Sequence, residues 1–136
     1  MRKYIVTFIL LTLATFLLTG CTNRDSNGRS EEFIFQKISP EEANEMITSS
    51  SELIILDVRT QEEYDEGHIS GAILIPNDEI ELKAEEILTD KNATILVYCR
   101  SGRRSALASQ TLSELGYLSI YDFGGILDWP YEIVTN

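Results

Sequence analysis

Ala93-Thr94-Ile95-Leu96-Val97-Tyr98 and the residues that follow it, Cys99-Arg100-Ser101-Gly102-Arg103-Arg104-Ser105, decide the fold of this chain. The first segment is short, apolar and rich in β-branched and aromatic residues, which is typical of a buried strand. After the second segment, apolar residues recur at helical spacing up to Gly116, a residue suited to end a helix. Cys99 is therefore predicted to lie on a tight turn from a strand to a helix.

Such a turn is a good site for an anion. Backbone N–H groups of the turn and of the first helical residues can converge on one point. Arginines at a helix N-terminus are unfavourable unless an anion binds there. Amides and arginines together predict that the pKa of the Cys99 thiol lies below its usual ~8.5. We interpret Cys99 as a nucleophile, rather than as an inert core cysteine, and its anion-binding loop as Arg100, Ser101, Gly102, Arg103 and Arg104.

The rest of the chain alternates predicted helices and strands. Ser39-Pro40-Glu41-Glu42 and Thr60-Gln61-Glu62-Glu63 are capping boxes that each open a helix. Hydrophobic patterning predicts further strands at residues 53–56, 72–75 and 118–121, a helix over residues 78–88 and a last short helix beginning at Gly124-Gly125. The alternation predicts a three-layer α/β fold, in which helices flank a mostly parallel central sheet.

Ligands of such folds bind at the carboxyl ends of the strands, where Cys99 and Asp57 are both predicted to lie. Asp57 and Arg59 either support the cysteine loop through hydrogen bonds or an ion pair, or form an ordinary surface pair. His68, the only histidine, could act as a general base, but its glycine-flanked turn favours a structural role. The sequence contains no metal-ligand spacing, so we expect neither a metal nor another cofactor.

The N-terminus has the pattern of an export signal. A basic start and a 15-residue apolar run are followed by Leu18-Thr19-Gly20-Cys21, which resembles a bacterial lipobox. The run is shorter than the ~20 residues of a membrane span. We expect residues 1–20 to be a lipoprotein signal peptide and Cys21 to carry lipid, the alternative being an uncleaved anchor helix. Residues 21–32 are then the lipidated cysteine and a flexible tether.

This organisation places a domain of residues 33–136 in the cell envelope, anchored to a bacterial membrane on its extracytoplasmic side. The formal net charge of the chain is −11. Such an acidic balance argues against nucleic-acid binding and against a polybasic membrane patch. Lipidation of Cys21 would leave Cys99 as the only free thiol and exclude an internal disulfide.

Several separated motifs resemble those of the rhodanese (sulfurtransferase) family. The cysteine loop has the family pattern, with Cys99 followed by Gly102 and closed by Arg104. The resemblance extends from Phe33 to Val134. Its other motifs are Leu56-Asp57-Val58-Arg59, Glu63-Tyr64, Gly67-His68-Ile69-Ser70-Gly71-Ala72, Ile75-Pro76 and Gly124-Gly125-Ile126-Leu127-Asp128-Trp129.

The resemblance implies a rhodanese-like fold and a two-step sulfur transfer through a Cys99 persulfide. The donor would be a small anion such as thiosulfate, attracted by the arginines, and the acceptor cyanide or a thiol, including that of a redox protein. Two alternatives remain open. The first is a phosphatase or an arsenate reductase of the same fold. Such enzymes have one more residue in the loop, whereas here four residues separate Cys99 from Arg104. The second alternative is a non-catalytic module that binds a persulfide or a partner protein.

Overall fold

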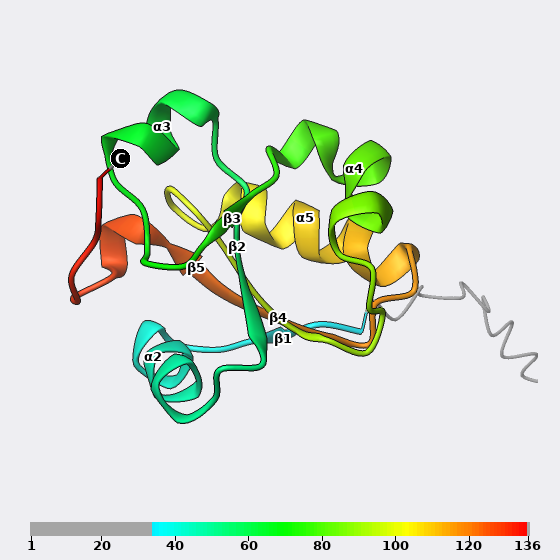
Figure 1. Cartoon of the computed structure of the whole chain (residues 1–136), viewed down its shortest axis with the longest axis horizontal. Helices are drawn as coiled ribbons and strands as arrows, with labels where there is room; N and C mark the ends of the chain where they lie inside the picture. The colour runs from blue at the N-terminus through cyan, green and yellow to red at the C-terminus, as the bar shows by residue number, and fades with distance from the viewer. Residues whose placement is uncertain (1–33, 136) are drawn as a thin grey trace, which may run out of the picture. The chain divides into compact units, whose positions relative to one another are not determined.

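A five-stranded sheet, parallel throughout, forms the centre of the domain in the computed structural model (Figure 1). The structure describes residues 34–135, so the predicted signal peptide, lipidated Cys21 and tether lie outside the described residues. The central strand, β4, ends at Cys99. Across the sheet the strands are β1 (Gln36–Lys37), β5 (Ser119–Gly125), β4 (Thr94–Cys99), β2 (Leu53–Asp57) and β3 (Ile73–Leu74).

Helices cover both faces of this sheet, which confirms the predicted three-layer α/β architecture. Figure 1 shows α2 on one side of the strands and α4 and α5 on the other. Two single 3₁₀ turns, η1 (Asn77–Glu79) and η2 (Ile126–Asp128), connect the larger elements. The α-helices are α2 (Pro40–Ser49), α3 (Gln61–Glu66), α4 (Ile80–Ile87) and α5 (Arg103–Glu114).

Strand β4 is buried on both faces, which explains why its sequence is a continuous apolar run. Alternate side chains point to opposite faces of a strand. Ile95, Val97 and Cys99 pack in the core beneath α4 and α5. Leu96 and Tyr98 pack in the second core, on the side of α2. The strand is thus held between two cores, and its last residue is placed at the carboxyl edge of the sheet.

Local hydrogen bonds define where the helices begin and end. Both predicted capping boxes are present, at Ser39 with Glu42 and at Thr60 with Glu63. Helix α5 differs because its N-cap residue, Gly102, provides no side chain to accept from the first amides. Its other end is closed as predicted by Gly116, which has φ +87°. The N-terminus of α5 therefore keeps amides available for another acceptor.

Three elements differ from their predicted form. Strand β5 continues to Gly125, so the Gly124-Gly125 pair ends a strand as well as preceding the last short helix, which is the single 3₁₀ turn η2 with Gly125 as its N-cap residue. The helix predicted over residues 78–88 begins as the turn η1. Strand β1 was not predicted, because its two residues are polar and exposed and it exists only by pairing with β5.

Candidate active site

The thiol of Cys99 lies at the carboxyl end of β4 and faces the backbone of the loop that follows. Its sulfur accepts a hydrogen bond from the Gly102 amide, with 3.1 Å between N and Sγ. Gly102 has φ +95°, in the left-handed region that favours glycine, and this conformation folds the loop back over the sulfur. Cys99 is only 1% exposed. The predicted turn from strand to helix is confirmed.

Backbone donors determine the protonation of this thiol. Burial raises the pKa of the Cys99 thiol, because a thiolate loses its hydration there. The nearby amides of Ser105, Ser101 and Gly102 and the Ser105 hydroxyl group act in the opposite direction and lower that pKa. The Ser105 hydroxyl itself donates to the carbonyls of Gly102, over 3.0 Å, and Gly124, over 3.3 Å. The donors outweigh burial, so the pKa of Cys99 lies below its ordinary value. The thiolate, which is the nucleophilic form, is therefore more populated than in an ordinary cysteine.

Ser105→Ala should raise the pKa of the Cys99 thiol, because it removes a nearby hydroxyl group that helps to lower this pKa and keeps the amide. The rate of iodoacetamide alkylation would then be lower at pH values below the thiol pKa and unchanged above it. Ser109→Ala is the matched control: Ser109 is also buried in α5, and its hydroxyl has no hydrogen-bond partner within residues 34–135. Equal alkylation profiles for the two variants would contradict the role assigned to Ser105.

The cysteine loop rests directly on the end of β5. A Cβ atom added to Gly125 would lie 2.3 Å from the Arg100 carbonyl oxygen and 2.6 Å from the Ser101 Cα. The loop is also tied to the turn η2, where the Leu127 amide donates to the Arg100 carbonyl over 3.2 Å. The absence of a side chain at Gly125 therefore allows the loop backbone to approach this closely. The Gly124-Gly125 motif was noticed in the sequence, but this role depends on contacts between distant segments.

Arg104 is already paired within the protein. Its guanidinium group forms two hydrogen bonds with the Glu63 carboxylate, of 2.7 and 2.8 Å. These bonds hold the pKa of Glu63 down at about 2, although its partial burial acts in the opposite direction. Glu63 also caps α3 through the Thr60 amide. Part of the positive charge predicted to attract a substrate is thus neutralised, and Arg104 instead links α5 to α3.

The other two arginines of the loop lie beside different hollows. Arg100 lines a hollow of about 250 Å³, together with Arg59, Glu63 and the turn η2. Arg103 lines a hollow of about 560 Å³ on the side of α5 and β1. The structure therefore brings Ser101 and Gly102 to the sulfur through their backbone, but it does not gather the three guanidinium groups at one point.

The pair Asp57–Arg59 is buried, so the alternative of a surface pair is wrong. Asp57 is fully buried and Arg59 is 5% exposed, and the shortest distance between their charged atoms is 2.6 Å. Arg59 also donates to the Gly67 carbonyl over 2.7 Å and lies over the ring of Tyr98, 5.6 Å from its centroid. Because Tyr98 immediately precedes Cys99, the pair supports the strand that carries the thiol.

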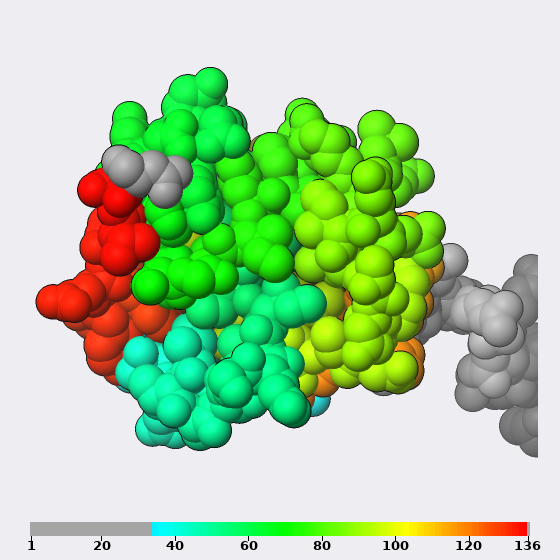
Figure 2. Space-filling view, viewed as in Figure 1, coloured from blue at the N-terminus to red at the C-terminus, as the bar shows by residue number. Residues whose placement is uncertain are grey.

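His68 has a structural environment, as its turn suggested. Its ring stacks on Tyr64, with 3.7 Å between centroids, and its Nδ1 lies 2.9 Å from the Tyr64 carbonyl. Its backbone forms an antiparallel bridge with Val134. Figure 2 shows the C-terminal residues, in red, lying against the green segment around α3. Within residues 34–135 no group of three or more His, Cys, Asp or Glu side chains could hold a metal ion.

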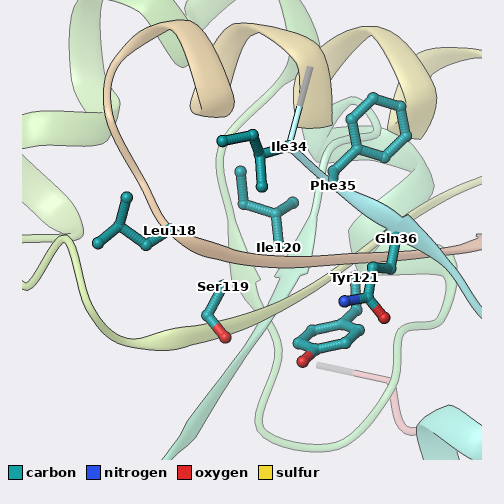
Figure 3. Close-up of a pocket in the computed structure, with 7 residues that line it drawn as sticks. All are labelled: Ile34, Phe35, Gln36, Leu118, Ser119, Ile120 and Tyr121. Atoms are coloured by element: carbon teal, nitrogen blue, oxygen red, sulfur yellow. The ribbon is translucent and has the colours of Figure 1, made fainter. Parts of the chain in front are cut away.

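One hollow, between β1 and β5, lies away from the thiol. Figure 3 shows its lining, from Ile34-Phe35-Gln36 on one side and Leu118-Ser119-Ile120-Tyr121 on the other. Leu118 and Ser119 lie at the beginning of β5, whereas the thiol lies at the carboxyl ends of the strands. This hollow of about 450 Å³ is therefore not part of the candidate active site.

The fold and the cysteine loop define a class of protein: a parallel α/β domain with a thiol held by backbone amides at the carboxyl edge of its sheet. Residues 39–131 match the family model described as Rhodanese-like domain. The chain belongs to the rhodanese-like family, and the resemblance that its motifs suggested is confirmed.

In the part of the chain that the structure describes, no helix is long and apolar enough to cross a membrane.

Named relatives include two thiosulfate sulfurtransferases. The chain is 42% identical over 73 residues to Thiosulfate sulfurtransferase PspE of Escherichia coli, covering 54% of this chain and 70% of PspE. It is 33% identical over 104 residues to Thiosulfate sulfurtransferase GlpE of Coxiella burnetii, covering 76% and 94%. Among solved structures, a rhodanese with anions from E. coli has a TM-score of 0.58 and 38% identity, covering 61% of this chain and 98% of that one.

Proposed function

We propose that this protein is a rhodanese-type sulfurtransferase that moves sulfane sulfur from a small anionic donor such as thiosulfate to a thiol or to cyanide. The observation that carries the proposal is the arrangement of amides around the Cys99 sulfur, with the Gly102 amide 3.1 Å away. These donors lower the pKa of the thiol without an external base. The family and its relatives named thiosulfate sulfurtransferase support the same reaction class.

In the first step, the Cys99 thiolate attacks the outer sulfur of thiosulfate. A bond forms between the two sulfurs, the bond between the outer sulfur and the sulfite group breaks, and sulfite leaves with the electron pair. The product is a persulfide whose terminal sulfur carries the negative charge. Amides of the loop residues Arg100, Ser101, Gly102, Arg103 and Arg104 would stabilise that charge without moving, because the backbone is already folded around the site.

In the second step, a cyanide ion or an acceptor thiolate attacks the terminal sulfur. The sulfur–sulfur bond to Cys99 breaks, the Cys99 thiolate leaves, and the product is thiocyanate or a new persulfide. The amides that hold the first thiolate also stabilise it as a leaving group. The cycle regenerates the free enzyme and needs neither an oxidant nor a reductant beyond the donor and the acceptor.

Thiosulfate treatment should add one sulfur atom to the protein at Cys99, and none to the Cys99→Ala variant. The expected result follows from the need for a thiolate nucleophile, and intact-protein mass spectrometry measures it. Subsequent cyanide should remove the added sulfur as thiocyanate. Release of phosphate from an aryl phosphate without sulfur uptake would favour the phosphatase alternative. If neither reaction is observed, the remaining alternative is a non-catalytic binding module.

We also propose that the protein is exported and anchored by lipid at Cys21, on the extracytoplasmic side of a bacterial membrane. The proposal rests on the lipobox-like ending Leu18-Thr19-Gly20-Cys21 after a short apolar run. Metabolic labelling with palmitate, with and without globomycin, tests it. Lipid incorporation that Cys21→Ala abolishes is the supporting result, and an unlabelled full-length protein is the contradicting one.

A further inference from the structure

The cations that lack a partner gather around the cysteine loop. Residues 34–135 contain 19 acidic and seven basic residues. Four of the seven basic residues form ion pairs within the domain: Arg59, Lys83, Lys91 and Arg104. The remaining three, Lys37, Arg100 and Arg103, have no such pair among the described residues and are exposed. In addition, residues 91–113 contain no acidic residue at all. Two of the three unpaired cations therefore belong to the cysteine loop itself, and the third, Lys37, lies in the neighbouring strand β1.

Two of these cations lie in the same groove. The groove, of about 560 Å³, runs from the cysteine loop along α5 and is lined by Phe35, Lys37, Gly102, Arg103, Ala106, Leu107 and Gln110. Its wall is apolar: Leu107 is 48% exposed, and Figure 3 shows the ring of Phe35 turned towards α5. One end of the groove is Gly102, the residue whose amide binds the Cys99 sulfur. A ligand in the groove would therefore lie against the loop that holds the Cys99 thiol.

The shape and chemistry of this groove do not suit the small donor. Thiosulfate and cyanide have no apolar group to place against Phe35 and Leu107, and they need only a fraction of the volume. Strand β1, beside the groove, is an exposed edge strand that pairs only with β5 within the described residues. An extended polypeptide can add to such an edge through its backbone. These features favour a polypeptide ligand with both aliphatic and acidic side chains.

We propose that this groove docks the sulfur acceptor, which is a protein segment that presents its thiol between aliphatic and acidic residues. The inference rests on the proposed sulfur transfer, since it identifies the class of acceptor for the Cys99 persulfide. Lys37 and Arg103 bind the acidic side chains, and Leu107 with Phe35 contacts the aliphatic ones. The acidic surface elsewhere repels the same segment, so the charge pattern directs it to the groove.

The test follows transfer from the thiosulfate-loaded full-length protein to two short peptides. One has a Cys flanked by Leu and Glu residues, and the other has Lys in place of each Glu. At low salt the acidic peptide should be the faster acceptor by roughly tenfold, and the difference should shrink at high salt because screening weakens exposed charges. Lys37→Glu should abolish or reverse the preference, and Leu107→Ser should slow transfer to both peptides.

Lys83→Glu is the matched control, because it makes the same charge change at an exposed residue outside the groove. Lys83 lies in α4 and pairs with Glu79. It should keep the preference of the unchanged protein. Thiosulfate loading and discharge to cyanide should be the same in all variants. Equal rates for the two peptides, or an equal effect of Lys37→Glu and Lys83→Glu, would overturn the inference.

Binding separates this inference from the proposed reaction. Fluorescence anisotropy of the labelled acidic peptide, with Ser in place of its Cys, measures docking to the Cys99→Ser protein without chemistry. If adding Lys37→Glu to the Cys99→Ser protein weakens peptide binding, the groove is supported as the docking site. This holds even if thiosulfate fails to load Cys99, in which case only the proposed reaction is wrong. If Lys37→Glu and Leu107→Ser leave the affinity for the peptide unchanged, the groove is not the docking site, even if the persulfide forms.

Discussion

Gly125→Ala is expected to reduce sulfur transfer by roughly 100-fold, a loss typical of a displacement of about 1 Å at a catalytic group. The new Cβ atom would lie 2.3 Å from the Arg100 carbonyl oxygen and 2.6 Å from the Ser101 Cα, distances that real structures do not tolerate. Both contacts are to backbone, which cannot rotate away. The loop must therefore move, and its amides would no longer face the Cys99 sulfur. Steady-state turnover of thiosulfate and cyanide measures the loss.

Gly71→Ala is the control for this substitution. Gly71 has φ +80°, so alanine there is strained, but its added Cβ atom would meet nothing within 4 Å. It should lower the free energy of unfolding by ~1–2 kcal/mol, the usual cost of a left-handed conformation, and leave turnover almost unchanged. Gly125 has φ −118°, which any residue can adopt, so only steric contact with the loop restricts it. Full activity of Gly125→Ala would refute the close contact.

Asp57→Ala should destabilise the folded protein by ~3–5 kcal/mol, because it leaves the buried Arg59 guanidinium without its counter-charge. Arg59 would keep its hydrogen bond to the Gly67 carbonyl, which cannot neutralise the charge. The free energy of unfolding from urea titration is the measurement. Since a small domain is stable by only ~5–15 kcal/mol, this loss would be a large part of the total.

Two further variants show whether the effect comes from the buried charge. Glu79→Ala breaks the exposed pair with Lys83 and should change the free energy of unfolding by less than ~1 kcal/mol. The double variant Asp57→Leu, Arg59→Met removes both buried charges and should be more stable than Asp57→Ala alone. If Asp57→Ala lowered the free energy of unfolding as little as Glu79→Ala, the buried pair would not have the role assigned to it.

Local features of the chain were predictable because they depend on neighbouring residues. The capping boxes at Ser39 and Thr60 and the helix end at Gly116 each involve groups only a few residues apart, and all three are confirmed. The buried character of β4 was visible because both of its faces are covered, which requires an unbroken apolar run. The position of Cys99 at the end of that strand followed directly.

Features that join distant segments were not predictable in this way. Glu63 and Arg104 are 41 residues apart, and nothing in either local pattern indicates that they pair. Strand β1 has no apolar pattern of its own and depends on β5 for its hydrogen bonds. The Gly124-Gly125 motif indicated the start of the short helix η2, but the close approach of the cysteine loop to Gly125 depends on a distant segment and was not predictable.

By itself, the sequence determined the order of the helices and of strands β2 to β5, the α/β class and the thiol on a turn between strand and helix, since hydrophobic periodicity and capping are local. The tertiary structure alone decided how the charged side chains around that turn are paired. It paired Arg104 with Glu63, buried Asp57 with Arg59, and left Lys37 and Arg103 unpaired along one groove. The physical reason is that the effect of a charge depends on distance and burial, and only the packing of residues far apart in the chain sets these.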